Sequence, residues 1–199
     1  RLSEIIHNHC NRMNHIIENV MQLSRRHAPK PIKTELNSWL ENFIHEYIST
    51  TNRDAEIKHT KSQESLYVTI DSSQLQQVLT NIFDNGIRYS RKKTGKPLLH
   101  LNAYASAPSG LTTLDIIDEG DGVDKEIEEK LFEPFFTTEN TGTGLGLYLS
   151  RELCEANQAQ IDYLRTTEGK SCFRISFSHP DKLIEEDFFM EDAMVKKNL

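Results

Sequence analysis

Three polar side chains in the stretch NIFDNGIRYS, residues 81–90, fall at helical spacing and so share one face of a predicted helix. They are Asn81, Asn85 and Arg88, and Asp84 lies close beside them. An asparagine amide oxygen is a suitable ligand for Mg²⁺, and an arginine is a suitable partner for phosphate oxygens. The face therefore has the chemistry of a metal–phosphate site, although such a face is also common as plain solvated surface.

A second candidate is the sequence DEGDG, residues 118–122, at the end of a predicted strand. Gly120 and Gly122 permit a turn that brings the backbone close to a ligand. The carboxylate of Asp118, if buried, could accept a hydrogen bond from an exocyclic amine such as that of adenine. The same pattern also occurs in ordinary turns, so the motif alone does not decide between the two.

A third candidate is the glycine-rich stretch TGTGLGL, residues 141–147, which leads into an apolar helix. Such a loop presents free N–H groups and a helix N-terminus to phosphate. It lacks the Gly-Lys-Ser/Thr of a P-loop and does not sit in a βαβ unit, which excludes a dinucleotide-binding fold. Just before it, LFEPFFTT (residues 131–138) places Phe135 and Phe136 beside a proline, as either a hydrophobic corner or the hinge of a lid.

Composition limits the protein classes that can hold these motifs. The 199 residues carry a net charge of −7, which argues against a broad nucleic-acid surface, and we expect the short basic run at residues 91–93 to be a solvated loop end. Three scattered cysteines indicate reduced thiols rather than a zinc site. No apolar run approaches a membrane span and no signal peptide opens the chain, which begins inside helical sequence like a fragment of a longer protein.

The first part of the chain has the pattern of a bundle helix. Apolar residues from Leu2 to Leu23 follow three-and-four spacing, and Pro29 and Pro31 end the helix. We therefore expect four regions: residues 1–28 as one helix of a bundle, 29–36 as a linker and first strand, 37–179 as one domain, and 180–199 as an acidic tail.

The region after Pro31 predicts an α+β domain with about three helices against a mostly antiparallel sheet. Asn37 is the expected N-cap of the first helix, and Asp71 or Ser72 that of the second, which should end near Ser90. The expected strands are 32–36, 56–59, 66–70, 98–105, 111–117, 160–164 and 172–178, and two further helices are expected over 125–130 and 144–156.

The three motifs, with LFEPFFTT between the second and third, stand in an order that resembles the ATPase domain of histidine kinases, within the superfamily that includes gyrase, Hsp90 and MutL. The resemblance covers residues 37–178 and implies a two-layer α/β sandwich preceded by one long bundle helix. It also implies ATP and Mg²⁺ as cofactors.

Carried onto this chain, the resemblance assigns a role to each matching residue. Asn85 would ligate Mg²⁺, with Asn81, Asp84 and Arg88 at the phosphate end. The expected nucleotide contacts are Tyr89, Asp118, Gly120, Gly122, Phe135, Phe136, Gly142, Thr143, Gly144, Leu145, Gly146 and Ser171.

One position separates kinases from hydrolases in this superfamily. The hydrolases place a glutamate four residues before the metal-binding asparagine to activate water. Here the position is Asn81, whose neutral amide cannot act as a general base. Two departures from the kinase pattern are Gly86, where alanine is usual, and Glu139, where a cation is common.

Residues 11–26 resemble the second dimerisation helix of sensor histidine kinases, and the accepting histidine would lie on a preceding helix absent from this chain. Several stretches are similar to the sensor kinases that regulate type IV pilin expression. The resemblance thus implies a homodimer in the full-length protein, a response-regulator partner of the NtrC type, and no nucleic-acid ligand. It also implies a cytoplasmic domain held at a bacterial inner membrane by upstream segments.

Two other functions fit the motifs. An anti-sigma-type serine kinase shares the fold but lacks a bundle helix like residues 1–28, and its product would carry acid-stable phosphate. A nucleotide-gated assembly module without catalysis is the non-enzymatic alternative.

Overall fold

The structure is a computed structural model that describes residues 28–51, 54–106, 110–139 and 142–178. The expected bundle helix and the acidic tail lie outside these ranges, so both stay predictions. Within the described ranges, no helix has the length and apolar character needed to cross a membrane.

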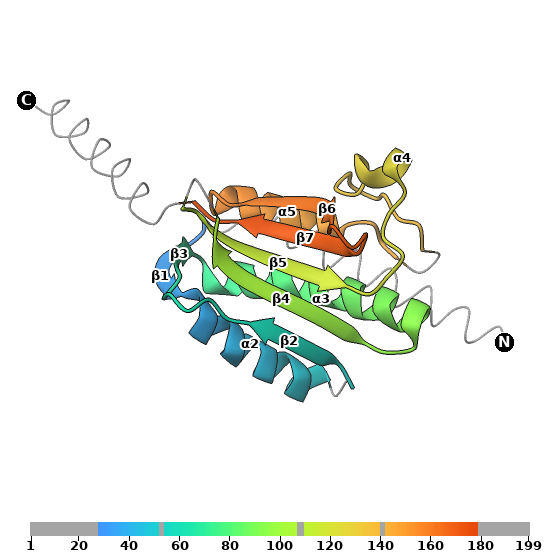
Figure 1. Ribbon diagram of the computed structural model, residues 1–199. Helices are drawn as coiled ribbons and strands as arrows, with labels where there is room; N and C mark the ends of the chain where they lie inside the picture. Colours follow the sequence, from blue (N-terminus) through green and yellow to red (C-terminus); the bar gives the residue numbers. More distant parts are fainter. Residues whose placement is uncertain (1–27, 52–53, 107–109, 140–141, 179–199) are drawn as a thin grey trace, which may run out of the picture.

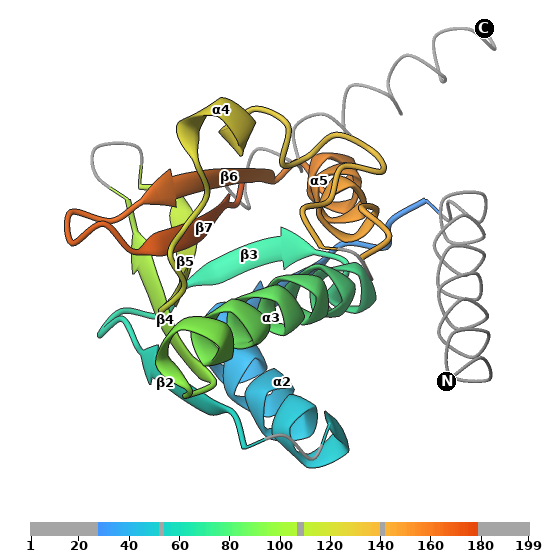
Figure 2. The same cartoon turned by 90° about the vertical axis from the view of Figure 1, so that its right-hand side faces the viewer.

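The fold is two layers, with helices covering one face of a five-stranded sheet (Figures 1 and 2). The strand order is β2 (Glu56–Thr60), β4 (Leu98–Ala105), β5 (Thr112–Asp118), β7 (Ser171–Ser176), β6 (Gln160–Arg165). Only the β2–β4 pair is parallel. Helices α2 (Leu36–Thr51), α3 (Ser72–Thr94) and α5 (Gly146–Ala156) form the other layer, and α4 (Lys125–Glu128) is a short addition. The predicted two-layer α+β sandwich is confirmed.

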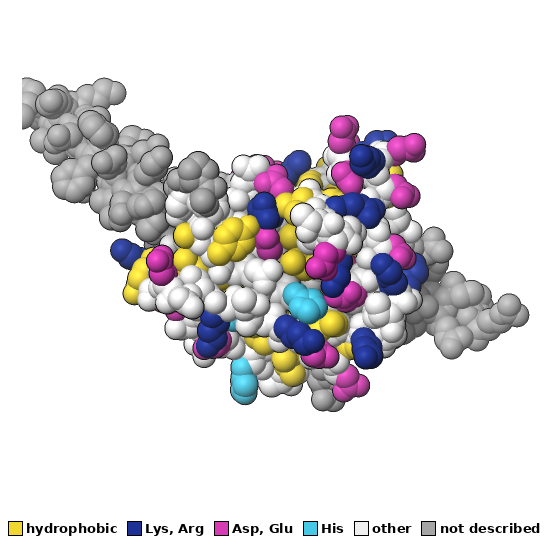
Figure 3. Space-filling view, in the orientation of Figure 1, with side chains coloured by type: hydrophobic (Ala, Val, Ile, Leu, Met, Phe, Trp, Pro, Cys, Tyr) yellow, Lys and Arg dark blue, Asp and Glu magenta, His cyan; other side chains and the backbone are white. Residues whose placement is uncertain are grey.

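Alternation along the strands separates a buried face from an open one. On β4, Leu99, Leu101 and Ala103 are buried, while the residues between them are partly exposed. The open face carries acidic, basic and histidine side chains side by side (Figure 3). One pair on it, Asp115 and Arg174, lies directly across β5 and β7 with an Oδ1–Nε distance of 2.7 Å.

Helix α3, which carries the first motif, is fixed at both ends. Of the two predicted caps, Asp71 is the one that caps its N-terminus, because its Oδ1 accepts the N–H groups of Ser73 and Gln74 at 2.9 and 3.2 Å. The helix runs past the expected end at Ser90 and stops at Gly95, whose φ of 74° suits a left-handed C-cap. Its apolar side packs into the core.

The expected N-cap at Asn37 is wrong. Helix α2 begins at Leu36, and the carboxylate of Glu35 accepts the N–H groups of Asn37 and Ser38 at 3.3 and 2.7 Å. Glu35 directly precedes the first helical residue, so its carboxylate lies at the N-cap position and reaches the N–H groups two and three residues further on. The Asn37 Oδ1 is instead buried and has no hydrogen-bond partner in the described part of the chain.

A separate two-stranded sheet, β1 (Ile32–Glu35) with β3 (Tyr67–Ile70), joins the linker to the domain. Just before it, the Lys30 N–H donates to Asp71 Oδ2 at 2.9 Å. The same carboxylate that caps α3 therefore also holds the linker.

Both cysteines in the described ranges are free and buried, in agreement with the predicted reduced thiols. Burial raises the pKa of the Cys154 and Cys172 thiols to about 12, so neither is a reactive thiolate at neutral pH.

Candidate functional site

A cavity of about 620 Å³ lies between α3, the ends of β5 and β7, and the segment that leads to α5. The sequence-predicted residues that line it are Asn81, Asp84, Asn85, Arg88, Tyr89, Asp118, Gly122, Phe136, Gly142, Thr143, Gly144, Gly146 and Ser171. Three predicted residues do not line the cavity: Gly120, Phe135 and Leu145. A second hollow of about 800 Å³ lies along the β6 edge, and none of the predicted site residues lines it.

One end of the cavity is built around the buried carboxylate of Asp118, which is 4% exposed. Asp118 pairs in register with Ser171 across β5 and β7. Its Oδ1 accepts the Gly120 N–H at 2.7 Å, and the Ser171 hydroxyl also hydrogen-bonds to the carboxylate. Burial raises the pKa of Asp118, and these two hydrogen bonds only partly oppose it.

Gly120 contributes by leaving space rather than by lining the cavity. A Cβ there would lie 2.7 Å from Asp118 Oδ1 and 2.9 Å from Tyr89 Cβ. Any side chain would therefore push Asp118 and Tyr89 apart. The glycine therefore allows Asp118 and Tyr89 to keep their positions around residue 120.

The other end of the cavity is the polar face of α3, where the predicted metal ligand already has a partner. Arg88 Nη2 donates to Asn85 Oδ1 at 2.8 Å, and the Arg88 guanidinium lies 5.0 Å from the centre of the Tyr89 ring. The Tyr47 hydroxyl of α2 donates to Asp84 Oδ1 at 2.6 Å, which fixes that carboxylate beside the face. An amide oxygen that faces the cavity next to a carboxylate fits the oxygen ligands that Mg²⁺ prefers.

Asn81 connects α3 to the start of α5. Its Nδ2 donates to the Gly146 carbonyl at 3.3 Å and to Ser150 Oγ at 3.4 Å. Helix α5 begins at Gly146, later than the expected Gly144, and its N-terminal turn borders the cavity. Free N–H groups at such a turn favour an anion.

The two phenylalanines of residues 131–138, Phe135 and Phe136, lie in different environments. Phe136 lines the cavity, whereas Phe135 is 65% exposed and has a φ of 66°. Gly144, with a φ of 69°, packs against their backbone so closely that a Cβ would lie 2.4 Å from the Phe135 carbonyl carbon. Leu145 is buried in the core and anchors the loop instead of touching the cavity.

Two lysines of the cavity wall were not predicted as site residues. Lys92 and Lys93 lie in the last turn of α3 rather than in a loop end. Lys92 Nζ is 3.5 Å from Glu139, and Lys93 Nζ is 3.3 Å from the Gly120 carbonyl oxygen and 3.2 Å from Asp121. Residue 92 follows Arg88 by four positions, so helical spacing alone would have placed it on the same face. The apolar wall from Ile127, Leu131 and Phe173 had no such signal.

Comparison with known proteins agrees with this geometry. Residues 70–181 match the family described as histidine kinase-, DNA gyrase B-, and HSP90-like ATPase. The chain is 47% identical over 183 residues to the sensor protein kinase PilS of Pseudomonas aeruginosa, which covers 92% of this chain and 34% of PilS. It is 29% identical to the signal transduction histidine-protein kinase AtoS of Escherichia coli, which covers 75% of this chain and 24% of AtoS.

Solved structures show the same fold. The histidine kinase AdeS of Acinetobacter baumannii superposes with a TM-score of 0.62 at 25% identity, covering 89% of this chain and 83% of that one. The histidine kinase ThkA, solved in complex with the response regulator protein TrrA, gives a TM-score of 0.68 at 22% identity, covering 89% of this chain and 51% of that one. The chain thus spans only a part of the curated relatives it matches.

Proposed function

Because the chain belongs to the histidine kinase-, DNA gyrase B-, and HSP90-like ATPase family and is the catalytic domain of a two-component sensor histidine kinase, we propose that it binds ATP with Mg²⁺ and transfers the γ-phosphoryl group to a histidine. The accepting histidine would lie on a dimerisation helix outside this chain. The observation that carries the proposal is the single cavity that joins the buried Asp118 carboxylate to the polar face of α3.

The buried end of the cavity suits adenine. The Asp118 carboxylate is an acceptor for the exocyclic amine. Gly120 keeps that carboxylate in place, since a Cβ there would clash with Asp118, and Gly122 lines the same end of the cavity. Tyr89 and Phe136 offer aromatic surface on the cavity wall. These residues bind and orient the nucleotide.

The α3 end suits the triphosphate and its metal. Asn85 would hold Mg²⁺, which neutralises charge on the phosphate oxygens when bound. Arg88, Lys92 and the N-terminal turn of α5 supply positive potential on the same side. Catalysis in this arrangement is mainly positioning and charge neutralisation.

Residue 81 favours transfer to an imidazole over hydrolysis. Its amide nitrogen is tied to Gly146 and Ser150, and an amide cannot remove a proton from water. The γ-phosphoryl group therefore remains available for an incoming histidine. From there we propose relay to an aspartate of an NtrC-type response regulator, by a homodimer whose upstream segments reach the inner membrane from the cytoplasm.

The experiment that tests the proposal has two stages. A calorimetric titration with a non-hydrolysable ATP analogue, with and without Mg²⁺, should give binding in the micromolar range. The chain is then mixed with γ-labelled ATP and a separate protein that contains the upstream dimerisation helix, and acid-labile label should appear on that helix. Acid-stable label would favour the serine-kinase alternative, and a folded chain that binds no nucleotide would contradict the proposal.

A further inference from the structure

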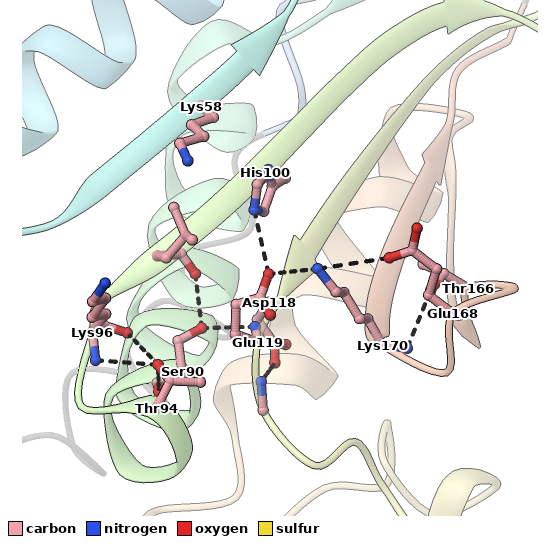
Figure 4. A network of polar contacts seen from close by, with 12 residues as sticks. Lys58, Ser90, Thr94, Lys96, His100, Asp118, Glu119, Thr166, Glu168 and Lys170 are labelled. Atoms are coloured by element: carbon pink, nitrogen blue, oxygen red, sulfur yellow. Dashed lines mark hydrogen bonds and ion pairs between the residues drawn. The ribbon is translucent and has the colours of Figure 1, made fainter.

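The carboxylate that faces the cavity is followed by a second one that faces away from it. Glu119 comes directly after Asp118, and its side chain meets His100 of β4 and Lys170, which precedes β7 (Figure 4). The Glu119 Oε1 atom lies 2.7 Å from Lys170 Nζ and 3.3 Å from His100 Nε2. Glu119 follows Asp118 in the sequence, and Lys170 precedes Ser171. The ion pair therefore lies next to the register pair Asp118–Ser171.

The backbone of Glu119 is held from the helix layer as well. Its N–H donates to Ser90 Oγ at 2.9 Å, and the same hydroxyl donates to the Leu98 carbonyl at 2.8 Å. Ser90 is fully buried, so both contacts are shielded from water. Residue 119 is thus fixed from α3, from β4 and from the β6–β7 turn at once.

We propose that the Glu119–Lys170 ion pair is a positioning device that sets the place of Asp118 and thereby the preference of the site for adenine over guanine. This inference rests on the proposed function, since it concerns the same cavity. Adenine presents an amine donor where guanine presents a carbonyl acceptor. A carboxylate held in place accepts the first and repels the second, whereas a carboxylate free to shift discriminates less.

The pair acts on Asp118 electrostatically too. The groups that face Asp118 or its neighbour are Glu119, Lys93 of α3, the Ser171 hydroxyl, Lys170 and His100. Burial is the largest cause of the raised pKa of Asp118, and the negative charge of Glu119 adds to it. Lys170 lowers the pKa of Glu119 by hydrogen bonding to it. Loss of Lys170 would leave the Glu119 charge uncompensated and raise the pKa of Asp118 further. Loss of the Glu119 charge would lower it.

The test compares Glu119→Gln, Lys170→Met and Lys170→Arg with the native chain by titration with non-hydrolysable ATP and GTP analogues between about pH 5 and pH 8. The first two should weaken ATP binding by roughly threefold and lower the ATP-to-GTP affinity ratio, a size typical of a partly exposed pair. Lys170→Arg should restore both values. The acid limit of ATP binding should move to higher pH in Lys170→Met and to lower pH in Glu119→Gln.

Lys61→Met is the matched control, because Lys61 pairs with Glu41 of α2 and neither residue lines the cavity. It should change neither the affinity ratio nor the acid limit. The inference is wrong if Glu119→Gln and Lys170→Met lower the unfolding midpoint but leave the ATP-to-GTP affinity ratio and the acid limit native. The pair would then only stabilise the fold. A folded native chain that binds neither analogue would overturn the proposed function itself and this inference with it.

Discussion

The two ends of the cavity are prepared to different degrees. At the end proposed for adenine, called the adenine end below, Asp118 is buried and accepts hydrogen bonds from Gly120 and Ser171, its register partner on the adjacent strand. At the end proposed for the triphosphate, called the phosphate end below, Arg88 donates a hydrogen bond to Asn85, and Lys92 lies beside Glu139. A bound triphosphate and metal would have to exchange these internal partners for their own contacts.

This contrast fits what the proposed function would require of each end. The base is the same before and after transfer, so its pocket can be rigid and specific. The charge on the phosphates would change during the transfer. Cations that already have partners within the protein would not be left unpaired when the ligand leaves. Predictions for the two ends therefore differ in size: a change at the first end should cost more nucleotide affinity than a change at the second.

The largest effect is expected from Asp118→Asn. The amide keeps the oxygen that accepts the Gly120 N–H but presents a donor to the adenine amine, so nucleotide affinity should fall by roughly tenfold to a hundredfold. Because burial disfavours the charged carboxylate, folding should not suffer. Calorimetry and thermal unfolding measure the two effects. The control Asp121→Asn, an exposed cavity residue, should bind nearly as the native chain does. Equal losses in both variants would show that the adenine end is not specific.

Gly144→Ala should damage the phosphate end selectively. An alanine at φ 69° is strained, and its Cβ would meet the Phe135 backbone, so the loop must shift. ATP affinity should fall by about tenfold, while adenosine affinity, which reports on the base alone, should stay native. Gly95→Ala carries a similar backbone strain with open space around the Cβ and is the control. A parallel loss of adenosine binding would erase the distinction between the ends.

Asn85→Ala should remove the benefit of Mg²⁺ without abolishing binding. Loss of the amide oxygen should leave the ATP affinity measured with Mg²⁺ close to that measured without it, a change of several-fold. The variant also frees Arg88 from its present partner, so binding without metal should be maintained. Asn102→Ala, on β4 away from the cavity, should keep the native response to Mg²⁺. An unaltered Mg²⁺ response in Asn85→Ala would place the metal elsewhere.

The smallest effect concerns stability and pH. The folded pKa of Asp118 is raised, so over the window between its unfolded and folded pKa values the native protein binds more protons than the unfolded chain. Its contribution to stability therefore falls as pH rises through that window. Asp118→Asn should be more stable than the native chain by a few degrees in unfolding midpoint at pH 7, and this advantage should shrink as the pH is lowered. An advantage that grows on acidification would contradict the sign of the shift.

The sequence predicted the parts of the site that depend on local chemistry. Asp118, Asn85 and the glycines each leave a pattern over a few residues, and helical or strand periodicity then places them. The N-cap at Asp71 was found for the same reason.

The parts that depend on packing could not be found in this way. The apolar wall at Phe173 and Leu131 is brought together only by the sheet order. Likewise, sequence cannot show that Phe135 turns outward while Phe136 turns inward, since that follows from the close approach of Gly144. Glu35 was missed as a cap because it is the last residue of β1, and the sequence does not show that the strand passes directly into α2 there.

The shared carboxylate of Asp71 has a mechanical meaning. The linker is anchored at the N-terminus of the helix that carries Asn81 and Asn85, because one side chain both receives Lys30 and caps α3. The Asp71 N–H in turn donates to Asn157 Oδ1 at the end of α5, the helix that begins beside the cavity. The linker is therefore coupled through one residue to both helices that border the end of the cavity proposed for the triphosphate.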